Sequence, residues 1–579
     1  MLLICSSFVL TTTTTEPEKA FAATASRWEP GRIIDDRIFT DASAMSVGSI
    51  QSFLNTIGGS GSTCLKNYQT PEPLGNNNYG GNVSAAHAIW KAAQLYTINP
   101  QVLIVTLQKE QGLITTTNCS ETKYRTAMGF GCPDTAPCDA QWFGLSKQLF
   151  QAARHFRGYF DDTLTFVPFT LGNYSIGYHP NAACGGTTVN IQTRGTAALY
   201  SYTPYQPNGQ ALSNLYGSGG TCSSYGNRNF WRDFTDWFGS PTGDLVRTIN
   251  NGTMYLVSEG KKYPIPNQSI KNDFERLGPL NYVSDTYVNA LSTDSTLKRM
   301  VGSTSGSSLY LVNAGIKLPF TSCNSVADYG FSCAAILRLT GSQVSILSNG
   351  PPVTQLIKSG ANNSIYYMED GKKRPVSSWN DVKGMGVSLA INKLSDYIIN
   401  GYPTGDIVLA GGSLLKKSGS ATVYAVNNWS SSPSVFPVSN LNYARELGLS
   451  TSIRTVSNSE FSAYSVDATL GNKFSCSSTY YIGSNGISHS IHVDLLDDYG
   501  LSDTNFLAGG EICRNLPKSS QPFDRYIKVN NSIYFIENGT KRPFTSYGAY
   551  VNHGGTAANT VVVTDFFAAT IATGSNLSS

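Results

Sequence analysis

The segment "NPQVLIVTLQKEQGL", residues 99–113, places a carboxyl group at the end of an apolar stretch. Leu103, Leu107 and Glu110 are spaced i, i+4 and i+7, which puts their side chains on one face of a helix. Burial beside leucines and the negative end of the helix dipole both favour the protonated form of a carboxyl. A carboxyl in this state could act as a general acid near neutral pH. The alternative is that Glu110 marks the point where the helix reaches solvent.

The helix that must position Glu110 has clear ends. Asn99 is a typical N-cap, Pro100 suits the first helical position, and Gly112 suits the residue just past the end. Further helices are expected in four segments: 46–58, 84–98, 143–160 and 229–239. We expect the aromatic residues of the last segment to lie on one face of the helix and pack in the core, rather than to form a surface that binds a ligand. Residues from about 27 to 239 therefore read as helices and loops, and "GSPTG", residues 239–243, reads as a linker or a turn.

Composition limits the possible functions. The 579 residues suggest several domains, and charged residues make up only 14 %, with a net charge of +3. No basic run or acidic tail is present, so we expect no nucleic-acid partner. Abundant Gly, Ser, Thr and Asn with 32 tyrosines favour β structure and a polar surface that faces glycans.

The first 25 residues resemble a secretory signal peptide, with an apolar run from Leu2 to Leu10 and small-residue cleavage options. No other stretch approaches the ~18 apolar residues of a membrane span, so we expect a secreted protein without a transmembrane segment. With Cys5 set aside, ten cysteines remain, and an even number in an exported protein predicts disulfides. Zinc is the competing interpretation, but no CxxC pair occurs, so we predict no metal and no cofactor. The candidate disulfide cysteines are Cys64, Cys119, Cys132, Cys138, Cys184, Cys222, Cys323, Cys333, Cys476 and Cys513.

The C-terminal part, residues 244–579, repeats one pattern six times. Its marker tyrosines recur every 54–58 residues: Tyr255, Tyr310, Tyr366, Tyr424, Tyr480 and Tyr534. Each unit opens with a predicted hairpin, commonly with a Glu-Gly, Asp-Gly or Asn-Gly turn, and continues with a short helical segment and another strand. Units of ~55 residues bury little alone, so we expect them to pack together, either as a closed six-bladed propeller or as an open array. The basic "GKKRP" motif is expected only to protect hairpin ends.

The Glu110 helix resembles that of the lysozyme-like superfamily, especially secreted bacterial lytic transglycosylases and glucosaminidases, where it ends in the catalytic acid. Gln111 stands where a serine is commoner. "YRTAMGFGCPD", residues 124–134, is similar to the loop that lines the glycan cleft in that group. "FTLGNYSIGYHPN", residues 169–181, resembles its Tyr-Asn-Ala-Gly element at Tyr174 and Gly177. Residues from about 33 to 239 also look like exported bacterial proteins labelled hemagglutinin-related.

The resemblance implies a multidomain fold: a mainly-α lysozyme-like domain over residues 26–240, followed by an all-β repeat domain. It implies a peptidoglycan-cleaving glycosidase or lytic transglycosylase in which Glu110 alone serves as acid and then base. The resemblance and the surrounding motifs suggest these substrate-binding residues: Gln111, Met128, Phe130, Gln141 with its neighbour Trp142, Tyr174, Tyr202 and Tyr205. The expected partner is peptidoglycan or another cell-surface glycan, and the repeats would anchor the protein at a cell surface, either directly or through a cell-surface protein. The alternative is a non-catalytic adhesin that holds glycan without cutting it.

Overall fold

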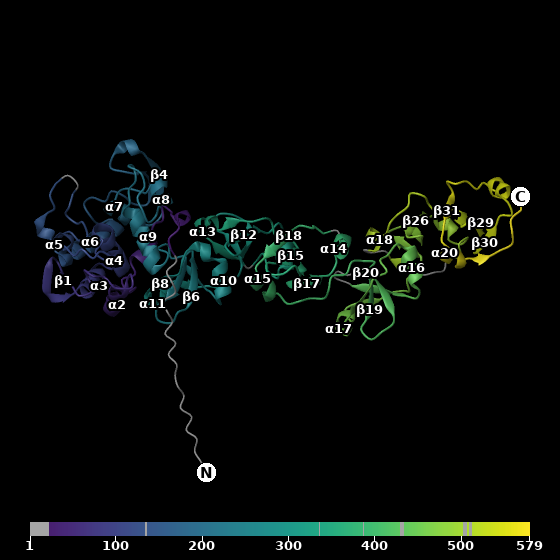
Figure 1. Cartoon of the computed structure of the whole chain (residues 1–579), viewed down its shortest axis with the longest axis horizontal. Coiled ribbons are helices and arrows are strands. Elements are labelled where there is room, and N and C mark those ends of the chain that lie inside the picture. Colours follow the sequence, from purple (N-terminus) through teal and green to yellow (C-terminus); the bar gives the residue numbers. More distant parts are fainter. Residues whose placement is uncertain are drawn as a thin grey trace, which may run out of the picture. The chain divides into compact units, whose positions relative to one another are not determined.

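The structure is a computed structural model that describes residues 22–133, 136–334, 336–385, 387–428, 433–501, 507–508 and 512–578. Residues 1–21, most of the expected signal peptide with Cys5, lie outside the described residues. The chain forms two compact units (Figure 1). The first unit comprises Met1–Pro319 and Ile336–Gly350, and the second comprises Phe320–Ala335 and Pro351–Ser579.

Three helices of the first 240 residues begin at the start of the segments predicted from the sequence, and one of them also ends at its predicted glycine. Ser46, Ser84 and Asn99 each accept a backbone hydrogen bond at the start of α2, α3 and α4, and Gly112 ends α4 in the left-handed region with φ +66°. These helices (purple and blue in Figure 1) are α1 (Asp36–Phe39), α2 (Val47–Thr56), α3 (Ala85–Tyr96), α4 (Pro100–Gln111), α5 (Glu121–Arg125), α6 (Leu145–Asp161), α7 (Arg194–Tyr202), α8 (Gly209–Ser213) and α9 (Gly226–Phe238).

The prediction of a mainly-α N-terminal domain is wrong, because two β-hairpins lie among the helices. One is β1 (Gln69–Gly75) with β2 (Asn78–Ser84), and the other is β3 (Gly172–Gly177) with β4 (Gly186–Ile191). The first turns through Asn76 and Asn77, which both have positive φ, and β1 packs on α3 and α6. Its strands are rich in Gly, Asn and Pro and bury only Thr70 and Pro73, so they lack the apolar alternation that identifies a strand in sequence.

The core of the first unit is continuous across the expected linker. It contains Leu103, Leu107 and Phe234 from the helices, and it extends to Val246 and Tyr287 of the first repeat. The 239–243 segment is buried: Ser240 is 7 % exposed and Thr242 is 6 % exposed. The N-terminal helices and the first repeat therefore share one hydrophobic core.

Buried polar contacts reinforce this junction. Arg32 pairs with the fully buried Asp244 at 3.1 Å, and Gln343 of the second repeat donates to the same carboxylate at 2.6 Å. Ser284 donates to Asp41 from its hydroxyl at 2.6 Å and from its backbone amide at 3.0 Å.

Each of the six repeats forms its own sheet of four or five strands in the described residues. Three antiparallel strands make the centre, and one or two further strands join the outside in parallel after short helices. Repeat 1 contains β5 (Leu245–Thr248), β6 (Met254–Ser258), β7 (Lys261–Pro264), α10 (Gln268–Asp273), β8 (Asn281–Val283), α11 (Asp285–Asn289) and β9 (Ser292–Thr293); repeat 2 contains β10 (Met300–Ser303), β11 (Leu309–Asn313), β12 (Ile316–Pro319), α12 (Cys323–Asp328), β13 (Leu337–Leu339), α13 (Gly341–Ile346) and β14 (Ser348–Asn349).

The other four repeats belong to the second unit and are also labelled in Figure 1. Repeat 3 contains β15 (Leu356–Ser359), β16 (Ile365–Glu369), β17 (Lys372–Val376), α14 (Trp379–Met385), β18 (Ile391–Leu394) and α15 (Asp396–Gly401); repeat 4 contains β19 (Leu414–Lys417), β20 (Val423–Asn428), β21 (Ser434–Val438), α16 (Leu441–Glu446), β22 (Ile453–Val456), α17 (Asn458–Phe461) and β23 (Ser465–Val466). Repeat 5 contains β24 (Lys473–Cys476), β25 (Thr479–Ser484), β26 (Ile487–Ile491), β27 (Leu507–Ala508) and α18 (Ile512–Asn515); repeat 6 contains β28 (Tyr526–Val529), β29 (Ser532–Glu537), β30 (Thr540–Pro543), α19 (Tyr547–Asn552), β31 (Thr560–Val562), α20 (Asp565–Ala569) and β32 (Ala572–Thr573).

The hairpin turns are confirmed, but the propeller and the all-β character are wrong. In five repeats both turn residues have positive φ, for example Asp370 at 49° and Gly371 at 72°, as a type I′ turn requires. Propeller blades are four-stranded sheets set around a central channel. Here each repeat instead adds its own parallel strands at its edges and contains short helices, and no closed sheet forms among the described residues. Equal spacing fixes the number of units but not the way their edges are paired.

Successive repeats are joined by a recurring carboxylate at the end of the first helix, which we call the latch carboxylate. Asp273 of repeat 1 accepts from Ala314 N at 2.9 Å in the turn of repeat 2, and its backbone oxygen accepts from Gly315 N. Asp498 of repeat 5 makes the equivalent contacts with Asn538 and Gly539 of repeat 6. Asp328 and Glu446 occupy the same position in repeats 2 and 4, and each has the matching backbone contact to the next hairpin turn.

The basic motif has a structural role that the sequence analysis did not anticipate. The second residue after the turn glycine is a lysine whose ammonium bonds to carbonyl oxygens near the end of the second short helix. These lysines are Lys262, Lys317, Lys373 and Lys541. Carbonyl oxygens at the C-terminal end of a helix carry partial negative charge, which a lysine ammonium offsets.

Candidate functional site

Glu110 lies where a buried helix reaches the surface. Pro100–Leu107 of α4 are buried, and Leu103 and Leu107 are fully so. The side chain of Glu110, on the same face one turn later, is 26 % exposed. The predicted leucine stripe thus ends in a carboxyl that is partly open to solvent.

The carboxyl of Glu110 has a close cationic neighbour. Lys109 Nζ is 2.8 Å from Glu110 Oε1, and the Lys109 side chain is only 5 % exposed. This ammonium also donates to Thr203 Oγ1 at 2.6 Å and lies 5.2 Å from the centre of the Tyr202 ring. Sequence reasoning missed Lys109, because consecutive helical residues do not normally face each other.

Tyr202 ties this group to the neighbouring loop. Its ring stacks on Phe156 at 4.5 Å, and its hydroxyl donates to Met128 O at 2.5 Å. Burial raises the pKa of Tyr202 well above its ordinary value, and the nearby charge of Glu110 raises it further. Tyr202 therefore remains a neutral hydrogen-bond donor.

The loop 126–131 passes directly against Glu110. A Cβ atom at Gly129 would lie 3.1 Å from Glu110 Oε2, and Gly129 has φ +72°. Both the contact and the backbone conformation require glycine here.

A buried glutamine of α6 holds this loop. Gln148 Oε1 accepts from Met128 N at 3.1 Å and from Phe130 N at 3.0 Å, while its Nε2 donates to Phe130 O and Trp142 O, both at 2.9 Å. The Phe130 ring packs on Trp142 at 5.7 Å and on His155 at 4.5 Å. Gln148 was not among the predicted residues, although a polar residue on the apolar face of a predicted helix was a possible signal.

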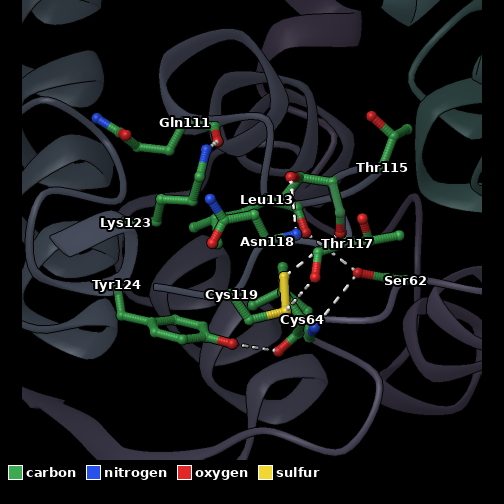
Figure 2. Close-up of a disulfide and its surroundings, with 12 residues drawn as sticks. Ser62, Cys64, Gln111, Leu113, Thr115, Thr117, Asn118, Cys119, Lys123 and Tyr124 are labelled. Atoms are coloured by element: carbon green, nitrogen blue, oxygen red, sulfur yellow. Dashed lines mark hydrogen bonds between the residues drawn. A yellow bond between two sulfur atoms is a disulfide. The ribbon is translucent and has the colours of Figure 1, made fainter. Parts of the chain in front are cut away.

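Disulfides fix the chain on both sides of the site. Figure 2 shows Cys64–Cys119, which holds the segment after α4, with Tyr124 donating to Cys64 O at 2.9 Å. In the same view Lys123 Nζ donates to the backbone oxygen of Gln111 at 2.7 Å. Cys132–Cys138 closes the chain immediately after the 126–131 loop.

The remaining predicted residues make contacts of their own. Gln141 is exposed and bonds to the carboxylate of Asp139 through its backbone and side-chain amides. Tyr174 on β3 bonds to Thr170 at 2.6 Å, and the Tyr205 backbone oxygen accepts from Asn227 at 3.0 Å. The structure thus brings together Glu110, Met128 and Tyr202, with Phe130 on the same loop. Tyr174 and Tyr205 contact other elements.

Two other carboxylates of this region are engaged in contacts away from Glu110. Asp139 holds Gln141, and Asp161 pairs with Arg157 at 2.5 Å. Asp134 lies outside the described residues. The described residues contain no cluster of three or more His, Cys, Asp or Glu that could hold a metal ion.

All ten candidate cysteines form disulfides: Cys64–Cys119, Cys132–Cys138, Cys184–Cys222, Cys323–Cys333 and Cys476–Cys513. Five disulfides suit an extracellular protein, because cytosolic thiols are kept reduced. Within the part of the chain that the structure describes, no helix has the length and apolar character needed to cross a membrane.

Comparisons with known proteins give little further information. No family model and no curated protein matches the sequence. A chain from the periplasmic assembly of the ESX-5 inner membrane complex is similar over 58 % of this chain and 94 % of its own, with 10 % identity and a TM-score of 0.11. A chain from the EccB3 dimer of the ESX-3 core complex is similar over 58 % of this chain and 98 % of its own, with 10 % identity and a TM-score of 0.12. TM-scores of this size do not establish a shared fold.

Proposed function

We propose that the region around Glu110 cleaves the glycan strands of peptidoglycan, and that Glu110 is the catalytic acid. The observation that carries this proposal is a partly exposed carboxyl at the end of a buried helix, set against the glycine of a rigidly held loop. A carboxyl on a rigid element can present its proton to a glycosidic oxygen without reorganising first.

The two carboxyl oxygens have different neighbours, and this assigns their roles. Oε1 is held by Lys109, so Oε2, which lies along Gly129, is the oxygen that would protonate the leaving group. A hydroxyl of the substrate would then attack the sugar as Glu110 takes back a proton. One carboxyl is enough for this route, whereas most glycosidases use two. Phe130, which is partly exposed on the loop beside Glu110, would line the glycan, whereas the predicted contact of Met128 is wrong because its side chain is fully buried.

Digestion of purified peptidoglycan, with mass spectrometry of the released fragments, tests the proposal. Glu110→Gln keeps the shape of the side chain but removes the proton, so release should fall by about 100-fold or more. Glu121→Gln, which changes an exposed acid on α5, is the matched control and should cleave normally. Anhydro ends would identify a transglycosylase and reducing ends a hydrolase. Near-normal release by Glu110→Gln would refute the role of Glu110.

A second candidate function is glycan binding without cleavage. The observation in its favour is the ion pair of Glu110 with Lys109, whose side chain is only 5 % exposed, because one carboxyl oxygen is already engaged. In this case the full chain would bind peptidoglycan in a pelleting assay and release no fragments. Glu110→Gln would then bind as wild type does.

We further propose that residues 244–579 retain the protein at the cell surface. Two of the five disulfides, Cys323–Cys333 and Cys476–Cys513, lie in this part and suit exposure outside the cytosol. Substitutions in the repeats should then reduce retention on intact cell walls without affecting cleavage of soluble glycan fragments.

A further inference from the structure

A cavity of about 560 Å³ lies within the second unit, where repeats 3, 4 and 5 meet. Repeat 3 contributes Asp381 and Lys383, repeat 4 contributes Ser413 and Arg454, and repeat 5 contributes Arg514. A volume of this size is typical of small-molecule sites.

Arg454, one of the lining residues, is held in place by an ion pair. Its Nη2 is 2.5 Å from Asp381 Oδ2, and Asp381 is only 4 % exposed and accepts from Ser413 Oγ at 3.1 Å. The other terminal nitrogen, Nη1, is buried and has no hydrogen-bond partner among the described residues. The Arg454 side chain as a whole is 26 % exposed and lines the cavity.

The charges of the lining favour an anion. Lys383, Arg454 and Arg514 are cationic, and Asp381 is the single carboxylate among the lining residues. Asp381 is already paired with Arg454 and fixes the orientation of its guanidinium. A planar guanidinium matches the oxygens of a phosphate or carboxylate group, and two further cations line the same cavity.

The remaining lining is polar and small. Ser450 and Ser452 line the cavity beside Gly411 and Gly412, so hydroxyls and backbone groups surround the space next to the cations. A single inorganic anion would leave most of this volume empty, whereas serine hydroxyls can bond to the hydroxyls of a sugar.

We propose that this cavity binds an anionic sugar unit, with its phosphate or carboxylate group on Arg454 and Lys383. The site is independent of Glu110, and it would give the repeats a defined ligand on an acidic surface polymer. Phosphate and carboxylate groups share this chemistry, and the choice of probes distinguishes them.

Isothermal titration of the full chain tests the site with glucose 6-phosphate, glucuronate and glucose. The first or second probe, or both, should bind with a Kd of about 1 mM or tighter, and neutral glucose should not bind at this level. Binding of glucose 6-phosphate alone assigns a phosphate, binding of glucuronate alone assigns a carboxylate, and binding of both assigns a general oxyanion site. Failure of both anionic probes to bind, or equal binding of glucose, overturns the proposal.

Lys383→Met is the decisive variant, because Lys383 is exposed and its loss does not leave a buried charge unpaired. It should weaken the binding of the anionic probe about tenfold. Arg454→Lys keeps the charge opposite Asp381 but loses the planar edge, and should weaken binding at least as much. Arg445→Met, at an exposed arginine on α16 of the same repeat, is the matched control and should bind within about twofold of wild type. Equal loss in the control would mean that surface charge alone attracts the probe, and the proposal would fail.

Discussion

The latch carboxylates join one repeat to the next, and their strength should depend on burial. In the first unit Asp273 Oδ2 accepts from Arg299 Nε at 2.5 Å, with side chains that are 5 % and 17 % exposed. Asp273→Ala leaves this guanidinium poorly solvated and without its anion, and breaking a buried pair costs about 3–5 kcal/mol. Arg299 keeps a hydrogen bond to Ser269 at 2.7 Å, so the lower end of this range is expected.

Asp498→Ala is the matched variant in the second unit. Asp498 pairs with Arg525 at 2.7 Å, but the Arg525 side chain is 46 % exposed, so water replaces the lost carboxylate. Its contact with Asn538 N is also long, at 3.4 Å. The expected loss is about 1 kcal/mol, typical of a solvent-exposed pair.

Native-state hydrogen exchange of the full chain measures both losses locally as free energies of opening. In Asp273→Ala the amide of Ala314 loses its acceptor and should exchange faster, whereas Gly315 N still donates to the backbone oxygen of residue 273 at 2.9 Å. Equal losses for the two variants would refute the argument that burial sets the strength of the latch. So would unchanged protection of Ala314.

Three further predictions concern stability, each measured by urea unfolding of the full chain. Lys317→Met should lower the free energy of unfolding by about 2–3 kcal/mol, because Lys317 is 9 % exposed and donates to the carbonyl oxygens of Val344 and Leu347. Lys261→Met removes an exposed lysine and should unfold as wild type does. A similar loss of stability in both variants would contradict the structural role of the buried lysine. Gly448→Ala should lower the free energy of unfolding by about 1–3 kcal/mol more than Gly419→Ala does. Both glycines have positive φ, but only at position 448 would a Cβ atom clash with a backbone oxygen, at 2.4 Å. Equal losses in the two variants would count against this clash. Burial raises the pKa of Asp41, so the folded state favours its protonated form. The free energy of unfolding of wild type, relative to that of Asp41→Asn, should therefore rise as the pH falls from 7 through the pKa of Asp41 in the folded state. It should level off below the pKa of an aspartate in the unfolded chain, about 3.9. A difference between the two proteins that does not vary with pH would contradict this prediction.

The features that the sequence predicted are those with local signals. The ends of α4 depend on Asn99, Pro100 and Gly112, which act within one turn of the helix. The hairpin turns of the repeats depend on two adjacent residues that tolerate positive φ. The ten paired cysteines follow from an even count and an exported context.

The features that the sequence did not predict depend on distant partners. Gln148 forms hydrogen bonds with a loop that lies 18–20 positions earlier in the sequence, and Lys109 donates a hydrogen bond to Thr203, 94 positions later. The parallel outer strands of each repeat are two to four residues long, too short to carry a periodic signal. The propeller was inferred from the equal spacing and the small size of the units, and neither specifies which strands pair.

The shared core of the first unit has a consequence for the order in which the chain acquires structure. Synthesis proceeds from the N-terminus, and the core that begins among the first helices is completed only by Val283, Tyr287 and Leu291. Asp41 cannot form its hydrogen bonds with Ser284 until that residue, 243 positions later, has been synthesised. At roughly 5–20 residues per second, the 50 or so residues beyond Gly239 take roughly 3–10 s to emerge. During that interval the region of Glu110 is complete in sequence but not in packing, so a nascent chain arrested near Gly239 should still be open to proteases, and protection should begin only when the first repeat is finished.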